Sequence, residues 1–131
     1  MGGIETLKNF TSYENKSFVY SIEGLIAVNV VVEGIAGNDD TEIKAGTLMG
    51  MITASKTYNI YDNAAGDGRT TAIGILLNDI GAISEGDKVN ATILVKGSFV
   101  KELLTGYDAN ALTDLLGRLI VVDANKTILA I

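Results

Sequence analysis

Apolar and polar residues alternate along much of the chain, and the alternation predicts a protein built mainly of β-strands. The pattern is clearest in residues 45–77, which predict a strand, a short turn, a second strand, a corner and a third strand. In the first of these strands, Leu48, Ile52 and Ala54 are expected to share one side. The third strand ends in an apolar run near Leu77.

The second strand and the corner that follows it have distinct signatures. Tyr58 and Ile60 alternate with polar neighbours, as in a strand that is buried on one face. Asp67-Gly68 predicts the corner, because glycine tolerates the positive φ that tight turns require. Residues 45–77 contain no catalytic motif, so they are expected to form scaffold.

Residues 18–36 predict another long β segment. Phe18 and Tyr20 begin an alternating pattern, and near-continuous apolar runs follow, rich in the β-branched residues that favour strands. Gly24 and Gly34 are expected to mark a bend and a strand end. A run this apolar is either buried on both faces or contacts another subunit with one face, and the sequence leaves both alternatives open.

The C-terminal half predicts a further strand, one helix and a pair of short strands. Residues 89–95 alternate, and Lys96-Gly97 is expected to close that strand. Asp108 can cap a helix. An apolar stripe at helical spacing follows, formed by Leu112, Leu115, Leu116 and Leu119. Residues 119–122 and 127–129 flank a polar turn, which predicts a strand–turn–strand end.

These elements indicate a mainly β (α+β) fold with one short C-terminal helix. The 131 residues fit one domain, and we expect it to span residues 18–131 behind an N-terminal arm at residues 1–17. The chain has 15 glycines, no proline and no cysteine. Turns must therefore be made by Gly, Asn and Asp, and no disulfide can stabilise the fold.

The charge of the chain argues against two classes of partner. The net charge is −6, and the ten basic residues are scattered. Nucleic-acid binding needs a concentrated basic surface, and anionic membranes repel an acidic one. No segment reaches the roughly 20 apolar residues of a membrane span, and the N-terminus lacks the pattern of a signal peptide. We therefore expect a soluble protein, made in a cytoplasm, that binds neither nucleic acid nor membrane.

The residues that could carry catalysis or bind a metal are few. The chain has no His or Cys, so the usual base near neutral pH and the thiolate nucleophile are both missing. The carboxylate pairs Asp39/Asp40 and Asp62/Asp67 lie in predicted turns, where such side chains usually bond their own backbone. The sequence therefore predicts no enzyme, no cofactor and no metal site.

The N-terminal arm carries apolar residues at a spacing of three, namely Ile4, Leu7, Phe10 and Tyr13. Seventeen residues with so few apolar side chains cannot build a core. Either the arm packs on its own domain or frays, or it becomes ordered on a partner surface, for instance by adding a strand to a sheet edge.

The chain resembles the lambda-type bacteriophage head decoration proteins over roughly residues 43–105. The resemblance depends on the order and spacing of small, apolar and Gly-rich motifs: Ala45-Gly46-Thr47-Leu48, Ile52-Thr53, Tyr58, Tyr61-Asp62, Ala64-Ala65, Asp67-Gly68, Thr71-Ala72-Ile73-Gly74-Ile75-Leu76 and Ala91-Thr92-Ile93-Leu94-Val95-Lys96-Gly97. One departure is Asn63, where members of the family often carry Pro. This departure concerns a rigid corner and not the fold.

The resemblance implies a capsid cement on the outer surface of the virion. Such a protein forms a homotrimer at three-fold and quasi-three-fold positions, bridges subunits of the major capsid protein and stabilises the expanded shell. Because the family engages the capsid with its N-terminal segment, the predicted capsid-facing residues are Ile4, Leu7, Phe10, Tyr13, Phe18 and Tyr20. The alternative is a small β-domain that binds carbohydrate or a receptor, although the chain has no Trp and only eight other aromatic residues to form a glycan platform.

Overall fold

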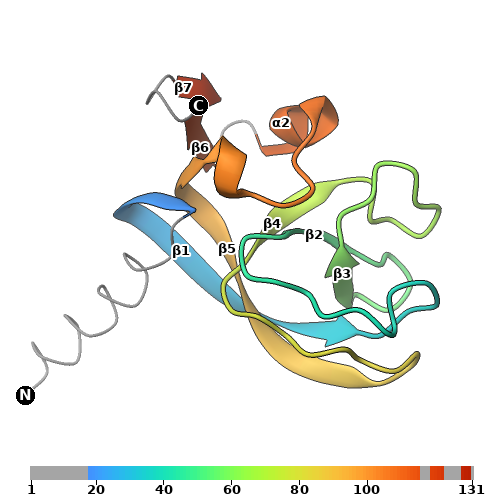
Figure 1. The fold of residues 1–131 in the computed structure, drawn as a ribbon. Coiled ribbons are helices and arrows are strands. Elements are labelled where there is room, and N and C mark those ends of the chain that lie inside the picture. The colour runs from blue at the N-terminus through green and yellow to red at the C-terminus, as the bar shows by residue number, and fades with distance from the viewer. Residues whose placement is uncertain (1–17, 116–118, 123–127, 131) are drawn as a thin grey trace, which may run out of the picture.

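The computed structural model describes residues 18–115, 119–122 and 128–130 of the chain, and these form a β barrel with a small C-terminal layer (Figure 1). The elements in chain order are β1 (Val19–Glu33), β2 (Leu48–Met51), β3 (Tyr58–Ile60), β4 (Ala72–Leu76), β5 (Lys88–Val100), the 3-10 helix η1 (Lys101–Leu103), α2 (Ala109–Leu115), β6 (Leu119–Val122) and β7 (Ile128–Ala130).

Five of the strands close on one another in the order β1-β3-β2-β4-β5, because β5 also pairs with β1. The longest pairing joins β1 and β5, which run antiparallel as a two-stranded ribbon. The barrel closes through one parallel pair, Val32 with Tyr58. β6 then adds parallel to the far end of β5, and β7 adds antiparallel to β6. The mainly β fold with one short helix is therefore confirmed.

Three strands of the barrel each bury two successive residues, which belong to different cores. These pairs are Leu48-Met49 in β2, Ile75-Leu76 in β4 and Ile93-Leu94 in β5. One residue of each pair packs with Leu115 of α2 and Leu119 of β6, and the other packs with Val32 of β1 inside the barrel. Successive strand residues face opposite ways. The apolar runs at these strands therefore reflect a sheet that is buried on both faces.

Several predicted turns and ends are confirmed. Gly24 has φ +74° at an irregularity of the β1–β5 pairing, and β1 ends just before Gly34. Gly68 has φ +111° at the predicted corner. Asp108 caps the helix, since its Oδ1 accepts the Ala111 N–H at 2.7 Å. The terminal strand pair is present as β6 and β7.

One predicted strand end is wrong, and strand pairing decides between the two predictions made for Leu119, the helical stripe and the strand over residues 119–122. β5 does not close at Lys96-Gly97 but continues to Val100, since residues 97–100 pair with β6 while Ser98 and Phe99 pair with β1. Leu119 does not belong to the helix but begins β6. Leu115 and Leu119 nevertheless pack in the same core, although Leu115 belongs to the helix and Leu119 to a strand.

Two predicted strands differ from expectation: the first is shorter, and the second buries its polar residue. β2 ends at Met51, so Ile52 lies outside the strand and exposed Ala54 lies in the following turn. In β3 the polar residue is the buried one. Asn59 is 1% exposed, and its Nδ2 donates to the Glu33 carbonyl at 2.7 Å. A satisfied amide thus takes the inward position between half-buried Tyr58 and Ile60.

A buried tyrosine joins the helix to the barrel. Tyr61 is 5% exposed, and its hydroxyl donates to Asp108 Oδ1 at 2.8 Å. Desolvation raises the pKa of Tyr61, and the hydrogen bond to Asp108 raises it further. Asp114 provides a second link, because its Oδ2 accepts the Ala72 N–H at 2.9 Å.

Substitution of Tyr61 by Phe tests the hydrogen bond that links the helix to the barrel. We expect Tyr61→Phe to lower the free energy of unfolding by about 1 kcal/mol at pH 7, the usual net value of a hydrogen bond. The native pKa of Tyr61 is raised, so its contribution to stability is complete below the unfolded pKa of about 10 and declines at higher pH. Urea unfolding between pH 8 and 11 should therefore show the two proteins converging above pH 10. A difference that stays constant with pH would contradict this role.

Candidate functional site

The predicted capsid-facing residues fall into two groups with respect to the structure. Ile4, Leu7, Phe10 and Tyr13 lie outside the described residues. Phe18 and Tyr20 are described, and they differ sharply. The Phe18 side chain is 4% exposed and belongs to the core shared with α2 and β6, whereas Tyr20 is 45% exposed. Of the two described residues, Tyr20 is therefore the one whose side chain a partner could contact.

Phe18 is fixed from two sides. Its carbonyl accepts the Val100 N–H at 2.9 Å, at the end of β5. Its ring lies against Gly46, where a Cβ would stand 3.1 Å from Phe18 Cδ1. Phe18, the first described residue, is thus packed where β1, the end of β5 and the turn before β2 meet.

From residue 28 to residue 33, the β1–β5 ribbon has one apolar face and one largely polar face. Directly opposed residues of an antiparallel pair share a face. Val28 opposes Ile93 on the apolar face, whereas Asn29 opposes Thr92 on the other, and the Thr92 hydroxyl donates to Asn29 Oδ1 at 3.0 Å. The apolar face is incompletely covered, since Val28 is 39% exposed. Ile26, which lies beyond the register shift and opposes Lys96, is 45% exposed.

The uncovered residues lie beside a strand edge. Within the described residues, the edge of β1 away from β5 pairs with another strand only at Val32, where it meets β3. Figure 1 shows β1 as part of the barrel wall, beside β5. Of the two alternatives for the apolar run, burial on both faces is wrong for Ile26 and Val28. Ile26 and Val28 were not among the predicted capsid-facing residues. The sequence signal for them is the apolar run, which is too continuous for a strand with only one buried face.

The carboxylates at the predicted corner support backbone structure. The Asp67 carboxylate accepts a hydrogen bond from Arg69 Nε at 3.0 Å, and Arg69 Nη1 donates to the Ile60 carbonyl at 2.9 Å. Desolvation raises the pKa of Asp67, but the hydrogen bonds from Arg69 outweigh it and hold the pKa below its usual value. Asp62 accepts the Ala64 N–H at 2.9 Å. Both carboxylates therefore act in turns, as their position in the sequence predicted.

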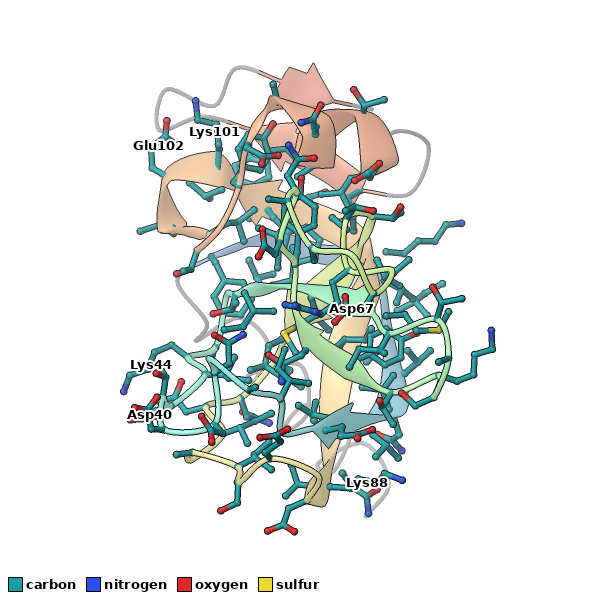
Figure 2. The ribbon with its side chains drawn as sticks, turned by 90° about the vertical axis from the view of Figure 1, so that its right-hand side faces the viewer. Asp40, Lys44, Asp67, Lys88, Lys101 and Glu102 are labelled. Carbon is teal, nitrogen blue, oxygen red and sulfur yellow. The ribbon has the colours of Figure 1, made fainter. Side chains whose placement is uncertain are left out.

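The remaining acidic turns have similar local partners. Lys44 lies 3.0 Å from Glu42 and 3.8 Å from Asp79, and Asp79 also accepts the Ala45 N–H at 2.7 Å. Asp40 accepts a hydrogen bond from Thr41 at 3.2 Å. Figure 2 shows Asp40 and Lys44 together at one end of the molecule, far from Lys101 and Glu102 at the other. Among the residues described, no three His, Cys, Asp or Glu side chains gather closely enough to hold a metal ion.

Two shallow hollows on the surface are polar and lack aromatic side chains. The larger, of about 470 Å³, lies between residues 80–84 and the start of β5 and includes Asp87 and Lys88. The other, of about 410 Å³, lies on the polar face of the ribbon around Asn29 and Asn90. Glycan sites usually offer an aromatic platform, and neither hollow has one. In the described part of the chain, no helix is both long and apolar enough to cross a membrane.

Comparison with known proteins identifies the class to which this barrel belongs, that of structural proteins of the phage head. Residues 11–118 match the family model described as bacteriophage lambda head decoration protein D. The match covers well over half of the chain, and the chain belongs to this family. A comparison with curated proteins gave no match. Membership places the protein on the capsid of a virion and confirms the family inferred from residues 43–105, now over a longer stretch.

Proposed function

We propose that this decoration protein is a trimeric cement on the outer surface of the head. Three copies would stand at each three-fold and quasi-three-fold position, bridge neighbouring major capsid protein subunits and stabilise the expanded shell against the pressure of packaged DNA. The protein would be made in the cytoplasm of the bacterial host. The observation that carries the proposal is the family match over residues 11–118.

The surface of the described chain supports contact with proteins over binding of a small polar ligand. Ile26 and Val28 are aliphatic, exposed and close to a strand edge, which is the kind of surface that interfaces bury. The carboxylates at the corner are engaged with their own backbone or with Arg69. In this proposal Tyr20 and the arm residues Ile4, Leu7, Phe10 and Tyr13 contact the capsid, whereas Phe18 holds the arm to the domain.

Many weak contacts explain how such a protein could strengthen a shell. Each copy needs only a modest interface, because the stabilisation of the shell grows with the number of copies bound. If the binding site exists only in the expanded lattice, each bound copy also favours that lattice by its differential affinity. Binding after expansion then requires no further switch in this chain.

Co-sedimentation with empty phage heads tests the proposal. The full chain is expected to sediment with expanded heads until its sites are saturated, and to stay in the supernatant with unexpanded heads at the same concentration. Absence of binding to expanded heads would contradict the proposal. Specific binding on a glycan array, without head binding, would instead support the carbohydrate-binding alternative.

A further inference from the structure

We infer that residues 18–24, which we name the arm root, form a segment that can open from the barrel separately, with Phe18 as its anchor and Gly24 as its hinge. The anchor sets where the N-terminal arm leaves the domain. How opening of the arm root affects capsid binding depends on the proposed function, whereas the opening itself can be tested on the isolated protein.

The pairing of β1 divides the strand into two unequal parts. From Ala27 to Glu33 every residue pairs with β5 in continuous antiparallel register. Before Ala27 the pairs are Val19 with Phe99, Ser21 with Ser98 and Ile26 with Lys96, and the register shifts between each of them. The arm root is therefore held to β5 by fewer pairs than the rest of β1, and local opening favours such segments.

Phe18 compensates for this sparse pairing at the outer end. Its ring is buried in a core that also contains residues of β4, β5, α2 and β6, and its carbonyl accepts the Val100 N–H. Gly46 has φ +89° and lets the ring approach its backbone closely. Burial of an aromatic side chain is a large apolar contribution, so Phe18 anchors the outer end of the arm root.

The inner end of the arm root combines a hinge with a second anchor. Gly24 has φ +74°, and among the described residues no atom lies within 4 Å of the position that a Cβ would take. Because glycine has no Cβ, its backbone has a wider conformational range than that of other residues, as a hinge requires. The next residue, Leu25, packs against the same core as Phe18. Its Cδ1 would stand 2.6 Å from a Cβ at Gly97, which shows how closely it lies on β5. Opening would thus stop at Leu25.

Opening would move the first anchored residue of the domain from Phe18 to Leu25. With the arm root closed, residues 1–17 precede the anchor, and with it open, seven more residues join them. Seven residues add about 25 Å of extended chain. A longer tether lowers the effective concentration of the arm at a site beside the domain. The closed root would therefore favour capsid sites close to the body of the bound protein.

Amide hydrogen exchange on Phe18→Ala tests the inference directly. We expect exchange in residues 19–24 to accelerate about tenfold or more, while residues 27–33 stay protected as in the parent protein. Phe18→Val is the milder variant should Phe18→Ala not fold, and it should show the same selectivity. The matched control is Leu115→Ala, which removes volume from the same core on α2 and should not accelerate residues 19–24 beyond residues 27–33.

Two results would overturn the inference: equal acceleration of both parts of β1 in the Phe18 variants, or no acceleration of residues 19–24. The proposed function fails by a different result, which is absence of head binding by the unmodified chain. The two failures are therefore distinguishable.

Discussion

Removal of residues 1–17 is expected to abolish binding to expanded heads and to leave the barrel folded. The described cores use residues from Phe18 onward, so the shortened chain keeps Phe18, its hydrogen bond to Val100 and the complete barrel. In the proposed function, binding would suffer because Phe10 and Tyr13 would be the large anchors of the arm. Aromatic anchors contribute about 2 kcal/mol or more each, so losing two weakens binding roughly a thousandfold.

The measurement is co-sedimentation of the shortened chain with expanded heads, with thermal unfolding as the check on folding. A full-length variant in which Ile4, Leu7, Phe10 and Tyr13 are all Ala should bind as poorly as the shortened chain. Its matched control changes the polar residues of the same arm, Thr6, Lys8, Asn9 and Ser12, to Ala and should still bind. Normal decoration of heads by the shortened chain would show that the arm is not the binding element.

Local patterns predicted most of the strands, because side-chain alternation follows directly from strand geometry. They failed where residues distant in the sequence meet. Lys96-Gly97 resembles a strand end, yet β6 pairs beside Gly97 and β5 continues. Leu119 fits both a helical spacing and the start of the predicted strand over residues 119–122, and its pairing with Gly97 shows that it belongs to the strand. In both cases a partner outside the local segment decided the end of the element.

At the candidate site, local patterns likewise did not predict which side chains are buried. Phe18 and Tyr20 are aromatic residues two positions apart, so periodicity treats them alike. The space beside Gly46 and the packing against α2 and β6 bury only Phe18. Likewise, the apolar run in β1 left open whether it was covered on both faces. Only the three-dimensional arrangement shows that, within the described residues, β3 pairs with β1 at Val32 alone and that Ile26 and Val28 are exposed.

Gly68→Ala is expected to cause a large loss of stability, because the corner at Asp67-Gly68 joins parts of the barrel. Gly68 has φ +111°, and a Cβ there would clash with Thr53 Oγ1 and lie 2.7 Å from the Met51 carbonyl oxygen. The adjoining hydrogen bond from Thr53 N–H to the Asp67 carbonyl, 2.9 Å long, would have to break or shift. Backbone strain of 1–3 kcal/mol and one or two lost hydrogen bonds together predict a cost of about 3 kcal/mol.

The midpoint of thermal unfolding measures this cost, and a fall of about 10 °C is expected for a domain of this size. Gly66→Ala is a close control, because Gly66 lies two residues away, has no positive φ and has no atom within 4 Å of the added Cβ. Its midpoint should change little. If the two variants unfolded within about 2 °C of each other, the corner would not be the rigid joint that the geometry indicates. If only Gly68→Ala unfolds early, the glycine of this Gly-rich family motif is required for the conformation of the corner.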